Sequence, residues 1–490
     1  MARLGIPMTR DELRNAINNA CDIMRREGLT TMDYMEQLSW LLFLKSFEET
    51  ENNLEAEAAY NGRAYDRILA GEYRWSAWAG PDRGLSGDAL VEFINNDLFP
   101  HLRSLSGTPE RAMIANIFAE IYRSRLQNGY VLRDVINIIE GIDFHSTEDV
   151  HVLSLIYEEL LAQMGSEAGF QGEFYTPRHI IRFMVEMVDP KIGETVYDPA
   201  CGTGGFLAEA YRRMREQESS IADYETLQKR TFYGREKSAR TYLLGLMNLV
   251  LHGIQVPNIE RTNTLARNVR NIPEAERYDV ILTNPPFGGS EHETIQQNFP
   301  IKGQATEMLF LQHIMKSLKR KPGSRAGVVV PEGMLFRGGA FASVRKELLE
   351  EFNLHTIVSM PPGVFLPYSG VKTNVLFFDR PGPTQDVWYY EIRHDGFSLT
   401  QTRRPIPEND ILDMLEKWRA RAESDWSWIV PIDEIVANGY DLTARNPRHA
   451  ETAERRSPEE LVASVLTKEE RLTELLGELQ ELLGGNSNAL

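Results

Sequence analysis

The stretch TVYDPACGTGGFLAEAYRRM, residues 195–214, decides the fold. A short β-rich run ends at Asp198, passes into a turn over Gly202, Gly204 and Gly205, and opens a helical pattern. Glycines let the backbone turn tightly and approach a ligand, and an acid at a strand end can accept hydrogen bonds from an amine-bearing ligand. The spacing is neither that of a P-loop nor G-x-G-x-x-G. It therefore predicts a strand–turn–helix that binds a ligand of another kind.

From this stretch onward, β-rich runs alternate with helical segments. The six runs are ETVYDPA (194–200), RTFYGRE (230–236), YDVILTNPP (278–286), RAGVVVPEG (325–333), LHTIVSMPP (354–362) and KTNVLFFD (372–379). The intervening segments are long enough for crossover helices, so the pattern predicts a parallel, doubly wound α/β sheet. Ligands of such sheets bind at the carboxyl ends of the strands.

The flanking regions are predicted to be helical. Thr9 and Glu12 form a capping box before an amphipathic run, and a second such run extends over about 31–51. Helical patterns recur over about 89–105, 109–126 and 148–164. Near the end, Ser457-Pro-Glu-Glu460 caps a leucine-rich helix. We therefore expect an all-α domain over 1–165, the α/β domain over 166–445 and a helical tail over 446–490 that docks on a partner.

Composition limits the classes of protein that this chain can belong to. The 490 residues are 42% hydrophobic and 25% charged, as in ordinary globular proteins. Asp and Glu number 71 against 53 Lys and Arg, and this net charge of -18 excludes a protein that coats nucleic acid by bulk charge. The two cysteines, Cys21 and Cys201, make no disulfide framework and fit no zinc motif. With no apolar stretch long enough for a bilayer, a reducing cytoplasm is expected.

A second acid follows the next strand. Glu236 ends the run RTFYGRE, 38 residues after Asp198. An acid at this strand end is placed to bind both ribose hydroxyls of an adenosine moiety. The pattern therefore favours an adenosine-containing ligand.

The segment Asn284-Pro285-Pro286-Phe287 is the most informative, because a buried strand runs directly into two prolines and an aromatic. Proline lacks the backbone donor and fixes φ, so the carbonyls are rigidly aimed. The Asn284 side-chain oxygen and the Pro285 carbonyl can both accept from one NH2 group and direct its lone pair toward an electrophile. Phe287 offers a flat face for the base that carries this amine.

In this order, the glycine loop and Asn284-Pro-Pro-Phe287 resemble the N6-adenine DNA methyltransferases. The upstream segment 172–178, GEFYTPR, is similar to their contact with the methionine part of S-adenosylmethionine, which gives the gamma motif order. Four further stretches resemble the modification subunit of type I restriction–modification systems: LSWLLFLKSFEE (38–49), PPGVF (361–365), TNVLFF (373–378) and GYDL (439–442) with RNP (445–447).

The resemblance implies a Rossmann-like class I S-adenosylmethionine-dependent methyltransferase sheet and a role for each motif residue. The target adenine would be held by Asn284, Pro285, Pro286 and Phe287. The residues implied to bind the cofactor are Tyr175, Thr176, Pro177, Asp198, Gly202, Thr203, Gly204, Gly205, Glu236 and Asn263. Asn263 lies where relatives often carry an acid near the cofactor's adenine, and an amide can still hydrogen-bond there.

Partners follow from the same resemblance, because no stretch of this chain is suited to reading base edges. The expected partners are double-stranded DNA, a DNA specificity subunit, a second modification subunit and a restriction subunit that can add to form the nuclease. The alternatives are a solitary adenine methyltransferase and an inactive scaffold subunit. Methylation of a protein glutamine or of cytosine N4, and a nicotinamide dehydrogenase, fit the motifs less well.

The clearest basic cluster comprises Lys316, Lys319, Arg320, Lys321 and Arg325. It follows a helical run, so complementing the helix dipole is favoured over facing DNA. The loop 288–306 has no strong periodicity and could instead close over an extruded base or the DNA.

Overall fold

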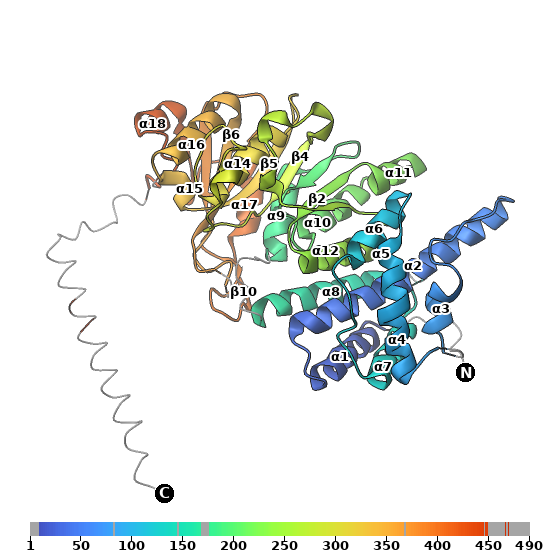
Figure 1. Ribbon diagram of the computed structural model, residues 1–490. Coiled ribbons are helices and arrows are strands. Elements are labelled where there is room, and N and C mark those ends of the chain that lie inside the picture. Colours follow the sequence, from blue (N-terminus) through green and yellow to red (C-terminus); the bar gives the residue numbers. More distant parts are fainter. Residues whose placement is uncertain are drawn as a thin grey trace, which may run out of the picture.

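The computed structural model describes residues 9–81, 84–144, 147–167, 176–366, 369–444 and 446–448, together with Leu466 and Glu469. A group of helices from the first third of the chain lies beside a large α/β unit (Figure 1). The expected tail helix over 446–490 lies almost wholly outside the described residues. Within the described part of the chain, no helix is long and apolar enough to cross a membrane.

The first third is helical, as predicted. Its elements are α1 (Arg10–Arg26), α2 (Thr31–Tyr60), η1 (Gly71–Tyr73), α3 (Trp75–Trp78), α4 (Gly87–Phe93), η2 (Ile94–Leu98), α5 (Phe99–Ser104), α6 (Pro109–Phe118), α7 (Gly129–Glu140) and α8 (Thr147–Glu167). The capping box of Thr9 and Glu12 is present at the start of α1. Three details differ from the sequence prediction: α2 continues to Tyr60, α6 ends already at Phe118, and α7 was not expected.

A nine-stranded sheet forms the centre of the α/β unit. Its strands are β1 (Val196–Asp198), β2 (Phe232–Glu236), β3 (Asn258–Arg261), β4 (Val280–Thr283), β5 (Arg325–Pro331), β6 (Asn353–Ser359), β7 (Thr373–Asp379), β8 (Asp386–Glu391) and β11 (Ser427–Pro431), in the order β11-β8-β6-β7-β5-β4-β1-β2-β3. A separate antiparallel pair is formed by β9 (Asp395–Phe397) and β10 (Pro405–Asn409).

The parallel arrangement predicted for the six strands is wrong for one of them, KTNVLFFD (β7), and the unpredicted strand β11 is also antiparallel to its neighbour. β7 runs antiparallel to both β5 and β6, and β11 runs antiparallel to β8. Parallel neighbours need a crossover connection, usually a helix. No helix occurs among the described residues between β6 and β7, so the chain returns directly and β7 is reversed. The other neighbouring pairs, from β3 through β5 and from β6 to β8, are parallel.

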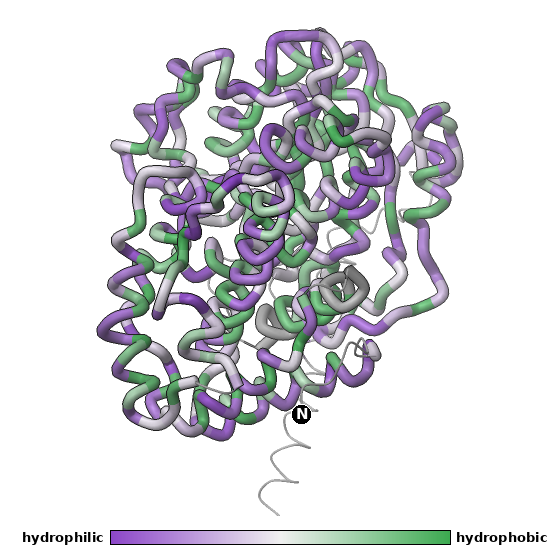
Figure 2. The backbone as a smooth tube through the Cα atoms, turned by 90° about the vertical axis from the view of Figure 1, so that its right-hand side faces the viewer, coloured by the Kyte–Doolittle hydropathy of each residue, from purple (hydrophilic) through white to green (hydrophobic). Residues whose placement is uncertain are grey.

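Helices cover both faces of the sheet (Figure 1). They are α9 (Arg178–Val188), α10 (Gly205–Arg215), α11 (Ile221–Lys229), α12 (Ala239–Leu251), α13 (Glu293–Gln296), α14 (Thr306–Ser317), α15 (Gly333–Phe336), α16 (Ala340–Glu351), α17 (Asp410–Trp418) and α18 (Ile432–Ala437), with the short turns η3 (Thr264–Ala266), η4 (Val269–Asn271) and η5 (Glu274–Glu276). Hydrophobic and hydrophilic positions alternate along the outer helices, as expected for helices with one face on a core (Figure 2).

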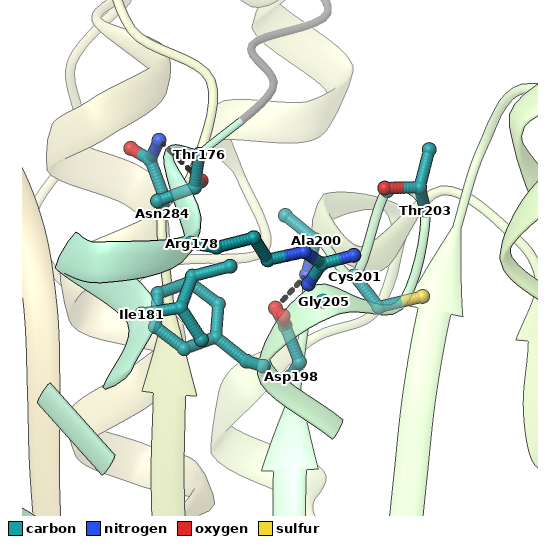
Figure 3. Close-up of a pocket in the computed structure, with 11 residues that line it drawn as sticks. Thr176, Arg178, Ile181, Asp198, Ala200, Cys201, Thr203, Gly205 and Asn284 are labelled. Atoms are coloured by element: carbon teal, nitrogen blue, oxygen red, sulfur yellow. Dashed lines mark hydrogen bonds between the residues drawn. The ribbon is translucent and has the colours of Figure 1, made fainter. Parts of the chain in front are cut away.

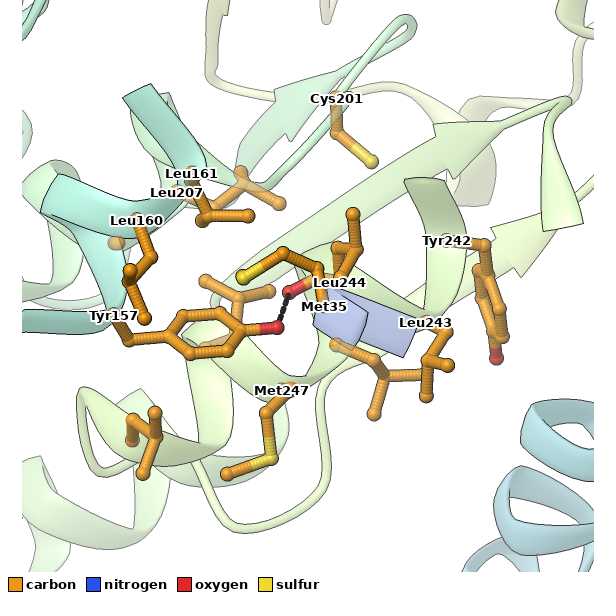
Figure 4. Packing of buried hydrophobic residues seen from close by; sticks show 14 of the residues in the cluster. Met35, Tyr157, Leu160, Leu161, Cys201, Leu207, Tyr242, Leu243, Leu244 and Met247 are labelled. Atoms are coloured by element: carbon orange, nitrogen blue, oxygen red, sulfur yellow. Dashed lines mark hydrogen bonds between the residues drawn. The ribbon is translucent and has the colours of Figure 1, made fainter. Parts of the chain in front are cut away.

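The helical unit and the α/β unit share one apolar core. α2 and α8 pack on α12, and a single cluster of buried residues runs from α1 into the sheet. At this junction the Tyr157 hydroxyl lies 2.6 Å from the Ser39 hydroxyl and 3.5 Å from the backbone oxygen of Leu244. Met35 and Met247 pack around it (Figure 4). The helices are therefore fixed against the side of the α/β unit that carries α10 and α12.

Candidate active site

A pocket lies where the strand order reverses, between β1 and β4. Asp198 ends β1 and Asn284 directly follows the neighbouring β4, so both stand at the carboxyl edge of the sheet. The residues that line the pocket are Thr176, Arg178, Ile181, Asp198, Ala200, Cys201, Gly202, Thr203, Gly205, Phe206 and Asn284 (Figure 3).

Six of the predicted site residues therefore share one pocket: Thr176, Asp198, Gly202, Thr203, Gly205 and Asn284. Pro177, Gly204, Glu236, Asn263 and the Pro285–Phe287 segment are not among the lining residues. Tyr175 lies outside the described residues. The assigned roles of all these residues remain predictions.

The glycine loop is held against α12. Gly202 and Gly204 adopt φ of 53° and 76°, which L side chains rarely adopt. The side-chain nitrogen of Asn248 donates to the Thr203 carbonyl at 2.8 Å. A Cβ at Gly245 would stand 2.6 Å from the Gly202 oxygen, so α12 approaches the loop as closely as a glycine permits.

Asp198 is a buried acid at the floor of the pocket, with 1% of its surface exposed. Its carboxylate accepts from the Thr283 hydroxyl at 2.6 Å and from the Ala200 amide at 3.0 Å. Burial raises the pKa of Asp198 to about 7, although these two hydrogen bonds act in the opposite direction. An acid with this pKa changes its charge near neutral pH.

Glu236, at the end of the neighbouring strand β2, is hydrogen-bonded to the glycine loop. Its carboxylate accepts from the Gly202 amide at 3.0 Å and from the Ser238 amide at 2.7 Å. A carboxylate oxygen can accept more than one hydrogen bond, so these contacts leave Glu236 able to bind hydroxyl groups as well. Asn263 is bonded locally, accepting from the Leu265 amide at 3.1 Å, while the adjacent Thr264 hydroxyl donates to the Pro199 carbonyl at 2.6 Å.

Asn284 has one satisfied and one unsatisfied end. Its amide nitrogen donates to the Thr176 hydroxyl at 3.0 Å, whereas its side-chain oxygen is buried and accepts no hydrogen bond within the described part of the chain. A buried polar atom without a partner is costly. The side-chain oxygen of Asn284 is therefore free to accept a hydrogen bond.

Two residues near this site were not predicted. Glu307, at the start of α14 and 6% exposed, accepts from the Gly288 amide at 3.2 Å and so anchors the end of the Asn-Pro-Pro-Phe turn. The sequence showed it only as an acid in the first turn of a helix. Arg178 lines the pocket at the start of α9. Its position directly after Thr176-Pro177 was the only available signal.

The basic cluster does not belong to this site. Lys319 and Lys321 each approach Asp279 to 2.6 Å, and Arg325 pairs with Glu194 at 2.8 Å. Burial acts to raise the pKa of Asp279, but the two lysines hold it well below its ordinary range. Asp279 precedes β4 and Arg325 begins β5, so the cluster lies at the opposite edge of the sheet from Asn284. The charges of Lys319, Lys321 and Arg325 therefore serve ion pairs within the chain.

The loop after Phe287 has internal structure. Ser290 pairs with Ala305, and the Thr306 amide donates to the Gly289 carbonyl at 3.2 Å. The short helix α13 lies within it. Closure of this loop over a substrate remains a prediction.

Two family models match the chain. The HsdM N-terminal domain matches residues 13–139, and N-6 DNA Methylase matches residues 148–456, more than half of the chain. Among similar proteins, the type I restriction enzyme EcoEI methylase subunit of Escherichia coli is 41% identical over 97% of this chain and 99% of its own length. The EcoKI methylase subunit of Escherichia coli K12 is 32% identical over 88% and 81%.

Solved structures give the same result. A chain from a study of complex assembly and conformational transition in a type I R-M system is 49% identical, with a TM-score of 0.81, and the match covers 98% of this chain and 100% of that one. A modification subunit from Vibrio vulnificus YJ016 is 41% identical with a TM-score of 0.81, over 92% and 100%. The similarity therefore spans both the helical and the α/β units.

Proposed function

The chain belongs to the N-6 DNA methylase family, and from this premise we propose that its pocket binds S-adenosylmethionine and presents it to an adenine extruded from DNA. The protein is an adenine-N6 DNA methyltransferase, the modification subunit of a type I restriction–modification system. One observation carries the assignment of chemistry to residues: the Asn284 side-chain oxygen is buried at the pocket and has no hydrogen-bond donor within the described ranges of the chain.

The residues around the pocket fit such a cofactor. The glycine loop forms a cradle that side chains at 202 and 204 would strain, and Asp198 lies at its floor. Glu236, which holds the loop through the Gly202 amide, is suited to bind the ribose hydroxyls. When bound, S-adenosylmethionine supplies a methyl group on a positively charged sulfur, which an amine can displace in line.

The Asn-Pro-Pro-Phe segment would hold the other reactant. Extruding a base from the duplex costs a few kcal/mol, and stacking on the half-buried Phe287 ring offsets part of this cost. The Asn284 oxygen and the Pro285 carbonyl would each accept from the adenine amine. The two hydrogen bonds orient the nitrogen lone pair and stabilise the positive charge that develops on the nitrogen during transfer. The proton that the nitrogen then loses passes to solvent.

Other subunits would supply DNA recognition and cleavage. The relatives are named as subunits of restriction enzymes. The net charge is -18, and three members of the clearest basic cluster, Lys319, Lys321 and Arg325, are occupied by ion pairs within the chain. We therefore propose a complex with a DNA specificity subunit, a second modification subunit and, for cleavage, a restriction subunit. The helical unit and the tail are the candidate docking regions, and the free, buried Cys21 and Cys201 suit a cytoplasmic location.

Labelled methyl transfer to duplex DNA tests this proposal. The chain is assayed with and without its specificity subunit, and the methylated base is identified after digestion. We expect the complex to form N6-methyladenine and the chain alone to be poor. Efficient methylation of a defined site by the chain alone would indicate a solitary enzyme. A complex that binds cofactor and DNA but transfers no methyl group would indicate a scaffold subunit.

A further inference from the structure

Arg178 reaches across the pocket from the first position of α9. Its side chain points toward Ala200 and lies above Asp198 (Figure 3). A Cβ at Gly205 would overlap the Arg178 guanidinium, so this group rests on the glycine that opens α10. The pocket floor therefore brings a guanidinium and a carboxyl group together.

This pairing matches the two charges of an amino acid. The guanidinium forms a planar fork that binds carboxylates with two hydrogen bonds, and the amide groups at the start of a helix also favour an anion. Asp198 suits an ammonium group. The methionine part of the proposed cofactor carries both groups on one carbon.

Arg178 is held in place from the helical unit. Its guanidinium lies 2.9 Å from a carboxylate oxygen of Glu158 on α8, and the His252 Nε2 lies 3.1 Å from the same oxygen. All three side chains are at most 15% exposed. Burial acts to raise the pKa of Glu158, but the contacts with His252 and Arg178 lower it below its ordinary value. Glu158 therefore remains ionised and balances the charge of Arg178.

The position of Glu158 is itself fixed by packing. Its neighbour Tyr157 is buried between Ser39 of α2 and Leu244 of α12 (Figure 4). α8 also contacts α1 and α2. A carboxylate on so tightly packed a helix can set the direction of a flexible arginine.

We propose that Glu158 is a positioning residue through which the helical unit directs Arg178 onto the carboxylate of the cofactor's methionine part. This inference rests on the proposed use of S-adenosylmethionine. It assigns to the helical unit, which carries no catalytic motif of its own, a contribution to cofactor affinity that is made through Arg178.

Two ligands distinguish an effect of Glu158 on the amino-acid part of the cofactor site from a general effect on the pocket. S-adenosylhomocysteine carries the amino-acid part, and methylthioadenosine lacks it. Calorimetry on the full chain measures the affinity of each for wild type, Glu158→Gln and the control Glu159→Gln. Glu159 is exposed and pairs with Arg14 instead, at 2.9 Å. We expect Glu158→Gln to weaken S-adenosylhomocysteine binding roughly tenfold, as for one misplaced charged hydrogen bond, with methylthioadenosine binding and the control unchanged.

Arg178→Gln completes a double-mutant cycle. If Glu158 acts through Arg178, the double variant loses no more S-adenosylhomocysteine affinity than Arg178→Gln alone. Additive losses, equal losses for both ligands, or no loss would each overturn the inference. Unfolding temperatures without ligand verify folding, and Glu158→Asp replaces Glu158→Gln if the latter unfolds. Wild-type protein that binds neither ligand would contradict the proposed cofactor, which is a separate failure.

Discussion

Thr176 and Asn284, 108 residues apart in the chain, are joined by a hydrogen bond of 3.0 Å from the Asn284 amide nitrogen to the Thr176 hydroxyl. This contact connects the segment before α9 with the end of β4. It satisfies one end of the amide and fixes the other end, whose oxygen has no donor among the described residues. The proposed acceptor for the adenine amine is therefore oriented before any substrate arrives.

Removing the Asn284 side-chain oxygen should slow methyl transfer without weakening cofactor binding. Asn284→Ala is expected to lower kcat by roughly 10²–10³-fold, the usual effect of losing one oriented polar group that stabilises developing charge. Single-turnover methyl transfer by the complex measures the rate, and calorimetry measures the affinity for S-adenosylhomocysteine. A variant that retains the wild-type rate would refute the role assigned to Asn284.

Loss of the Thr176 hydroxyl should leave the Asn284 side-chain amide without the hydrogen bond that orients it. Thr176→Val keeps the shape but leaves the Asn284 nitrogen without its acceptor, so kcat should fall about tenfold. Thr176→Ser retains the hydroxyl and is the matched control, expected to stay within about twofold. Equal rates for Val and Ser at this position would show that the hydrogen bond does not orient Asn284.

The raised pKa of Asp198 predicts a pH dependence of stability. Folding favours the neutral acid, so this contribution is complete below the unfolded-state pKa of about 4. It is lost as the pH rises through the folded-state pKa of about 7. The unfolding temperature of the ligand-free chain should therefore decrease as the pH is raised from about 4 to about 7. The share of this decrease that comes from Asp198 should be absent in Asp198→Asn. If the unfolding temperature of the variant depends on pH in the same way as that of the wild type, Asp198 is not the cause of this dependence.

The same ionisation should govern cofactor binding. A charged Asp198 is the form that binds an ammonium group, so S-adenosylhomocysteine should bind more tightly as the pH rises through about 7. Calorimetry across this range measures the effect. Methylthioadenosine has no ammonium group and provides the control. A matching pH dependence for both ligands would assign the effect to another group.

Close packing of α12 on the glycine loop predicts a strong effect of one methyl group. Gly245→Ala places a Cβ 2.6 Å from the Gly202 oxygen, and should lower the free energy of unfolding by about 1–3 kcal/mol. It should also weaken S-adenosylhomocysteine binding, because the loop must shift. Gly141→Ala, whose nearest neighbour lies 3.4 Å away, is the control. Chemical denaturation and calorimetry would detect either effect, and full tolerance of Gly245→Ala would show that the loop is not held by α12.

The basic cluster should contribute to the stability of the fold and not to the affinity for DNA. Lys319→Gln with Lys321→Gln removes two partners of the buried Asp279, so the free energy of unfolding should fall. DNA affinity of the complex should change less than about twofold, because these side chains are held at the edge of the sheet remote from Asn284. A large loss of DNA affinity, with folding intact, would place DNA at this edge.

The sequence was sufficient to predict the α/β fold and the neighbourhood of Asp198 and Asn284. Each follows a recognisable strand, and the strands β1 and β4 are adjacent and parallel, so their ends meet. The reversal of β7 was not predictable from its own residues, since KTNVLFFD is equally apolar in either direction. The direction is set by a connection without a crossover helix.

Other features depend on packing between distant segments. β3, with an exposed-buried-exposed-exposed pattern, carries little strand signal. The Glu158 contact with Arg178 joins α8 to α9. Nothing in the local pattern of α8 distinguishes Glu158 from Glu159, and only the packed arrangement shows that Glu158 contacts Arg178 and that Glu159 contacts Arg14.

The shared core of α2, α8 and α12 also limits how this kind of gene can recombine. The two family models meet between residues 139 and 148, which suggests a natural point for exchange between relatives. α2, which precedes that point, packs its apolar surface onto α8 and α12, which follow it. A chimaera joined there would pair an α2 from one relative with an α8 and an α12 from another, and their core side chains would not match. Exchanges that preserve folding should therefore transfer α2, α8 and α12 together.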